Sequence, residues 1–116
     1  RVQGSLHFIA ENVVRDGAGD GIRIEGSECF VTENQALNNG RDGFDIEPGA
    51  VFALVTENVA KGNRAEGFDN SGANTSFTDN KSTKNRIDYG ALLPFASFTG
   101  NKSSDGSGAG TLSEID

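Results

Sequence analysis

The sequence has few of the residues from which an ordinary globular core or a membrane segment is built. Only 34% of its 116 residues are hydrophobic, and tryptophan and methionine are absent. No apolar run approaches the roughly 20 residues of a membrane span, so a membrane partner is not expected. The single cysteine, Cys29, excludes an internal disulfide. Because it falls at an apolar position of the repeat, we expect a buried, inert thiol.

Basic residues are also scarce, with 10 Lys and Arg against 17 Asp and Glu and a net charge of −7. This balance argues against nucleic acid or an anionic membrane surface as a partner. It permits calcium, or contact with a neutral or metal-bridged substrate. No Ser/His/Asp set, Cys/His metal pattern or phosphate loop is present. The only histidine, His7, falls at an inward-facing position and is predicted to be structural.

What the sequence does contain is an asparagine that recurs at nearly constant spacing, after a short apolar or threonine-containing run each time. The steps between successive copies are 22, 24, 22 and 21 residues. The asparagines are Asn12, Asn34, Asn58, Asn80 and Asn101. A fixed period in this range is the signature of a stacked repeat, in which each coil needs only a few inward side chains.

Three strand-like segments recur in each period, which predicts an all-β protein. The expected fold is a right-handed parallel β-helix (β-solenoid) of about five coils with three short strands per coil, over residues 1–102. Residues 103–116 form a Gly/Ser-rich C-terminal tail. The asparagines are expected at turns, in the left-handed conformation, with their side chains bonded to one another along the stack.

The third segment of each coil alternates inward apolar residues with outward charged ones. Ile22, Phe44, Phe68 and Ile87 are predicted to point inward. The outward positions gather mostly acids on one face: Asp20, Arg23, Glu25, Asp42, Asp45, Glu47, Glu66, Asp69 and Asp88. Stacked like charges repel, and a calcium ion would offset that repulsion.

This acidic face allows three interpretations. It is a solvated surface that keeps the protein soluble, a metal-binding or sugar-binding face, or a catalytic pair whose carboxylates raise each other's pKa. As a metal site it would use Asp20, Asp42, Asp45 and Asp69. The substrate-binding residues would be Glu25, Glu47, Asp69 and Asp88, and the catalytic residues Arg23 and Asp45.

Two weaker features lie outside this face. Lys61, Lys81, Lys84 and Lys102 follow the repeated asparagines; they are either solvated turn residues or a basic rim for a uronate carboxylate. Tyr89 and Phe95 are either core or capping residues, or could stack on a sugar ring.

The repeat resembles the parallel β-helices of carbohydrate-active proteins, most closely the pectate lyases of polysaccharide lyase family nine. The resemblance rests on three stretches: residues 38–45, residues 66–70 and residues 80–89. It implies a secreted protein that binds an acidic polysaccharide and cleaves it by calcium-assisted β-elimination. The lysine base of that family falls on Asp45, or on Arg23 when the register is moved by one coil. Arg23 would then be the base or a substrate clamp.

The ends of a short solenoid expose unpaired strand edges, and no capping helix is visible at Arg1. We therefore expect further coils, or another chain packed end to end, and interpret the sequence as a processed or excised segment. A different class of function, a non-catalytic structural or adhesin-like segment, also fits these features.

Overall fold

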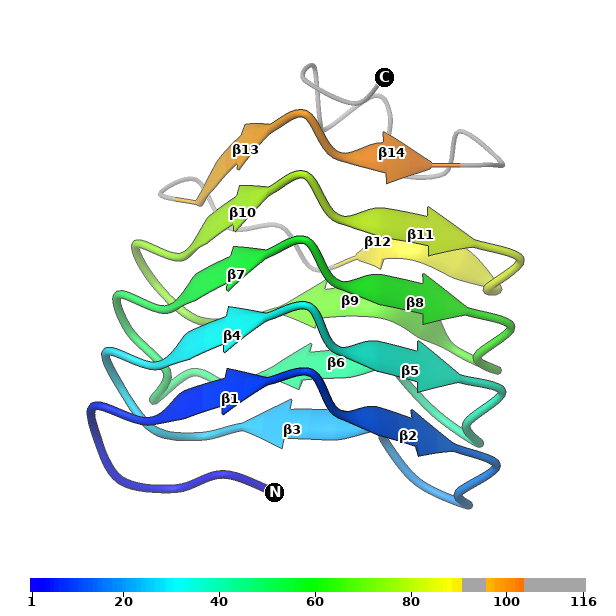
Figure 1. The fold of residues 1–116 in the computed structure, drawn as a ribbon, viewed down its shortest axis with the longest axis horizontal. Coiled ribbons are helices and arrows are strands. Elements are labelled where there is room, and N and C mark those ends of the chain that lie inside the picture. The colour runs from blue at the N-terminus through cyan, green and yellow to red at the C-terminus, as the bar shows by residue number, and fades with distance from the viewer. Residues whose placement is uncertain (91–95, 104–116) are drawn as a thin grey trace.

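The chain is a parallel β-solenoid of about four turns, built from three sheets (Figure 1). The computed structural model describes residues 1–90 and 96–103. In Figure 1 the chain runs from left to right along the front strands and returns behind them while it rises from the N-terminus, which is the sense of a right-handed coil. The predicted fold class and the three strands per coil are confirmed.

Each sheet stacks the same segment of successive coils, and every pairing is parallel. The first sheet contains β1 (Phe8–Ala10), β4 (Phe30–Thr32), β7 (Leu54–Thr56), β10 (Ser76–Thr78) and β13 (Ser97–Thr99). The second sheet contains β2 (Val13–Arg15), β5 (Gln35–Leu37), β8 (Val59–Lys61), β11 (Lys81–Thr83) and β14 (Lys102–Ser103). The third sheet contains β3 (Ile22–Ile24), β6 (Phe44–Ile46), β9 (Glu66–Asn70) and β12 (Ile87–Gly90).

The core is a set of vertical stacks of side chains, as the repeat predicts. Ile22, Phe44 and Phe68 are paired in register and buried, and the rings of Phe44 and Phe68 stack with centroids 4.7 Å apart. The thiol of Cys29 is buried, as predicted. His7 has the same inward register but remains exposed, because the first coil has no coil beneath it within the described residues.

The repeated asparagines form a continuous ladder between the first and second sheets. The side-chain oxygen of Asn58 accepts hydrogen bonds from the backbone N–H and the side-chain amide of Asn34, at 2.9 and 3.0 Å. The Asn58 amide in turn donates to the carbonyl of Val31 and to the side chain of Asn80. The predicted bonding along the stack is confirmed, and it satisfies polar groups that are fully buried.

A second ladder, which the sequence analysis missed, lies between the second and third sheets. It consists of Asn39, Asn63 and Asn85, with the N–H of Gly17 below them. Each of these asparagines follows the first ladder by five residues, and this constant offset was a signal that could have revealed them. The second sheet is therefore held between two asparagine ladders.

The prediction that the ladder asparagines adopt the left-handed conformation was wrong. The residue before each of them has the positive φ instead, for example Glu33 (φ 55°) and Glu57 (φ 55°). The turn is made by that preceding residue, and the asparagine side chain points inward and bonds to the neighbouring coil.

Two of the predictions concern residues that the structure does not describe. Phe95 and nearly all of the 103–116 tail lie outside the described residues. Among the described residues there is no helix with the length and apolar character needed to span a bilayer.

Replacing Asn58 by alanine should destabilise the protein by about 3 kcal/mol, because the buried N–H of Asn34 and the carbonyl of Val31 would lose their partners. Asn12→Ala is the matched control. Asn12 is exposed in the first coil, and its substitution should reduce the free energy of unfolding by only about 1 kcal/mol. Urea denaturation measures both; equal losses would show that the ladder does not stabilise the interior coils.

Candidate functional site

The outward face of the third sheet brings most of the predicted acids together. Asp20 and Asp42 lie just before β3 and β6, and Glu66 begins β9, so the three stack in successive coils. The Oδ1 of Asp20 accepts the backbone N–H of Asp42 at 3.2 Å, and the Oδ1 of Asp42 accepts that of Glu66 at 2.9 Å. These bonds fix the carboxylates at the edge of the sheet.

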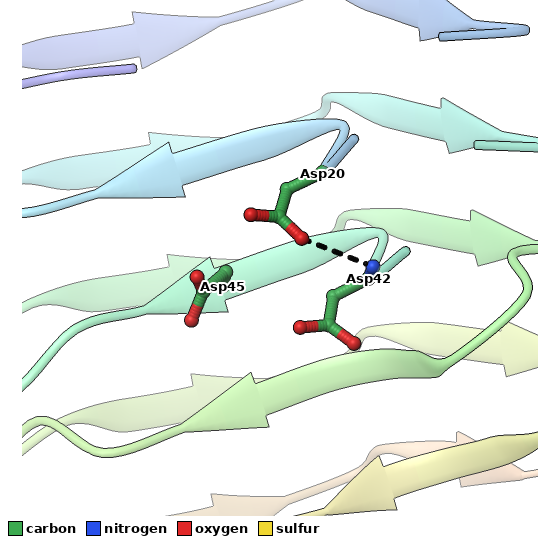
Figure 2. Close-up of side chains that lie close together, drawn as sticks. All are labelled: Asp20, Asp42 and Asp45. Atoms are coloured by element: carbon green, nitrogen blue, oxygen red, sulfur yellow. Dashed lines mark hydrogen bonds between the residues drawn. The ribbon is translucent and has the colours of Figure 1, made fainter. Parts of the chain in front are cut away.

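Two groups of three carboxylates result, and Asp42 belongs to both. Asp20, Asp42 and Asp45 each offer an oxygen within 4.8 Å of the others, and so do Asp42, Glu66 and Asp69. Figure 2 shows the first group, with Asp45 farther along β6 and the dashed bond from the amide of Asp42 to Asp20. Asp42 and Asp45 are only 4% and 7% exposed, so the acids are not a fully solvated fringe.

Arginines border the acids on both sides. The guanidinium of Arg23 lies 2.9 Å from Glu47, 3.6 Å from Glu25 and 3.8 Å from Asp45. Arg41 approaches Asp20 at 3.8 Å, and Arg86 approaches Glu66 at 3.4 Å. Arg41 and Arg86 were not predicted to take part. They occupy the turns before β6 and β12, which made them resemble ordinary solvated residues in the sequence.

The electrostatics favour protonated carboxyls where the acids crowd. Burial, together with the neighbouring Glu66 carboxyl, raises the pKa of Asp42 to about 7. Burial and the Glu47 carboxyl raise the pKa of Asp45 to about 8. The pKa of Asp69 is also raised, mainly by burial and then by Glu66. At neutral pH this face therefore holds protons that exposed carboxylates would have released.

Asp69 has a further anomaly that distinguishes the second group of carboxylates. Its Oδ1 is buried and has no hydrogen-bond partner within the part of the chain that the structure describes. A carboxylate oxygen shielded from water without a donor is destabilising, so it is expected to have a partner.

The prediction that Asp88 continues this acidic face was wrong, and so was the inward position of Ile87. Ile87 pairs with Glu66 and Tyr89 pairs with Phe68, which places Asp88 beside Gly67 on the inner side of the sheet. The buried Asp88 carboxylate accepts hydrogen bonds from Asn85, Ser82 and Ser103. Tyr89 takes the inward position and stacks on Phe68, so it is a core residue.

The remaining predicted residues lie at the start of the solenoid. Glu25 and Glu47 follow β3 and β6 on the outer face, and both contact Arg23. Glu25 also forms an ion pair with Arg1, and its hydrogen bond with Arg1 lowers the pKa of Glu25. The structure thus gathers Asp20, Arg23, Glu25, Asp42, Asp45, Glu47 and Asp69 on one face and removes Asp88 from it.

Searches against protein-family models, curated proteins and solved structures found no match. The site is therefore interpreted from its own chemistry.

The melting temperature in a chelating buffer should fall as the pH rises from 5 to 9. The folded protein holds protons on Asp42 and Asp45 that the unfolded chain, with an ordinary pKa of 3.8, has already released. This contribution to stability is complete below pH 3.8 and is lost as the pH rises through the folded pKa values of about 7 and 8. Asp45→Asn keeps the shape but cannot ionise, and should flatten this dependence. Asp79→Asn, at an exposed turn, should leave it unchanged. Scanning calorimetry over this pH range is the test, and parallel pH profiles for all three proteins would contradict it.

Proposed function

We propose that this β-solenoid is a calcium-dependent binding module for an acidic polysaccharide, with the acidic face of the third sheet as its metal site. The observation that carries the proposal is the group formed by Asp42, Glu66 and Asp69, whose carboxylate oxygens lie within 4.8 Å of one another. An oxygen of Asp69, Oδ1, is also buried without a hydrogen-bond partner among the described residues.

The residues fit calcium better than they fit other metals. Calcium takes six to eight oxygen ligands, and the donor set here consists of carboxylates alone, without the thiolate or imidazole that zinc prefers. Asp42, Glu66 and Asp69 would hold the ion, and water and sugar oxygens would complete its shell. The Asp20, Asp42 and Asp45 group is the weaker candidate, because Arg41 and Arg23 already lie near two of its members.

The surroundings of Arg23 favour binding over cleavage. A base for β-elimination must accept a proton, and an arginine can do so only from its neutral form. Arginine side chains stay protonated in proteins, and the guanidinium of Arg23 is already engaged by Glu25, Asp45 and Glu47, which lie within 4.0 Å of it. The catalytic roles of Arg23 and Asp45 stay predictions, and the proposed function does not depend on them.

An acidic polysaccharide is the ligand that this arrangement suits. Successive strands of a sheet are about 4.8 Å apart, so the face presents acids at a regular interval along the solenoid axis. A cation held there can join a carboxylate of the protein to a carboxylate of a sugar chain, and the net charge of −7 then no longer opposes association.

Calcium should raise the melting temperature of the native protein, by the equivalent of about 2.7 kcal/mol when its concentration is about 100 times the dissociation constant. Magnesium should have a smaller effect, because it gives up its own water reluctantly. Asp69→Asn should lose most of the calcium effect. Glu57→Gln, at an exposed turn outside the acidic face, should retain it. Thermal melts at increasing calcium decide the point, and an unchanged melting temperature of the native protein would rule out the metal site.

The polysaccharide is tested separately, by sedimentation with covalently crosslinked pectate and alginate, which stay insoluble in a chelator. Retention that calcium increases in the native protein, but not in Asp69→Asn, is the expected result. Retention that calcium does not increase, or none at all, would contradict it. An ultraviolet assay for unsaturated uronate ends on the same samples distinguishes binding from cleavage, and no gain in absorbance is expected.

A further inference from the structure

The lysines are concentrated on a different face from the acidic site. All four lysines of the chain lie on the second sheet or in the turn that leaves it: Lys61, Lys81, Lys84 and Lys102. Arg15 ends β2 in the same sheet. Among the described residues, no outward position of the second sheet carries an acid. In a chain with 17 acids and 10 bases this separation of charge is pronounced.

The strand register places these cations next to one another. Lys81 pairs with Lys102 on the following coil, and Lys61 pairs with Thr83. Adjacent like charges on paired strands destabilise a sheet. Lys61 and Lys81 are exposed and form no salt bridge within the described residues, so no carboxylate in the described part of the chain neutralises either ammonium group.

A groove runs across the same strands. It has a volume of about 540 Å³, and its lining includes Leu37, Val59, Lys61, Lys81, Thr83 and Lys84. Leu37 on β5 and Val59 on β8 give it an apolar floor, and Lys61 at the end of β8 and Lys81 at the start of β11 lie beside them. A floor of aliphatic carbon beside several ammonium groups suits a ligand that has both a C–H face and repeated anionic groups.

We propose that this groove is a second, calcium-independent binding site, and that its ligand is a uronate oligosaccharide. The C–H face of a sugar ring would lie on Leu37 and Val59, and its carboxylates would be bound by Lys61 and Lys81. The site shares no residue with the acidic face of the third sheet and goes beyond the calcium-dependent function proposed above. Either site can fail in experiment without the other.

Charge complementarity favours an acidic sugar over nucleic acid as the occupant. The cations form a short patch on one sheet, and the rest of the molecule is acidic enough to repel a long polyanion. The described lining of the groove also contains no aromatic side chain on which a base could stack.

Isothermal titration of the native protein with a galacturonate hexasaccharide, in a buffer containing EDTA, tests the proposal. We expect binding that weakens as salt increases. The double variant with Lys61→Gln and Lys81→Gln should bind about tenfold more weakly. Arg64→Gln, which removes an exposed cation from a turn outside this sheet, should bind like the native protein.

Three comparisons make the outcome decisive. The methyl-esterified hexasaccharide should not bind, because it lacks the carboxylates. A single-stranded oligonucleotide of similar charge that binds as tightly as the uronate would overturn the proposal and indicate non-specific attraction of polyanions. Undetectable uronate binding by the native protein, or an unchanged affinity in the double lysine variant, would also overturn it. The Asp69→Asn variant should keep this affinity even though it loses its response to calcium.

Discussion

The amide ladder is the constraint on which every other feature of this solenoid depends. Parallel strands can slip past one another when only their apolar faces select the register, and a slip of one residue turns each side chain to the opposite face. Here the side chain of Asn58 binds both the backbone and the side chain of Asn34, and its own amide continues to Asn80. The second ladder repeats this arrangement on the other side of the second sheet. Because the two asparagine ladders hold neighbouring coils together on both sides of the second sheet, the coils can stack in only one register.

A fixed register turns repeated sequence positions into columns of like charge. Asp20, Asp42 and Glu66 occupy one position of the repeat in successive coils, and Lys81 and Lys102 occupy another. Such columns are unfavourable for folding, because neighbouring strands bring their charges close together. They persist here because the buried amide bonds and the aromatic stacks, such as Phe44 on Phe68, stabilise the coils independently of the surface. The scaffold therefore tolerates surfaces that are suited to ligands.

Much of this arrangement could be predicted from spacing alone. The period and the inward column through Ile22, Phe44 and Phe68 were readable because they depend on local alternation and on a constant repeat. Asp88 was misplaced because Ile87 was matched to Phe68, whereas the structure pairs Ile87 with Glu66: Ile87 comes two positions after Asn85, and Glu66 three positions after Asn63. The bulky Tyr89, and not the apolar Ile87, then fills the aromatic column. Arg41 and Arg86 were missed for a related reason, since a turn residue reveals its partner only when the coils are stacked.

The raised pKa values and the proposed calcium site are two consequences of the same crowding. When carboxylates are held within 4.8 Å of one another and partly removed from water, either protons or a cation must reduce their repulsion. Protons do so in the metal-free protein, because Asp42 has a pKa of about 7. Calcium requires the ionised form, so the ion and the proton compete for the same oxygens and calcium is favoured as the pH rises. The acidic face would therefore gain affinity for calcium toward alkaline pH, as its carboxyls release the protons that hold them neutral.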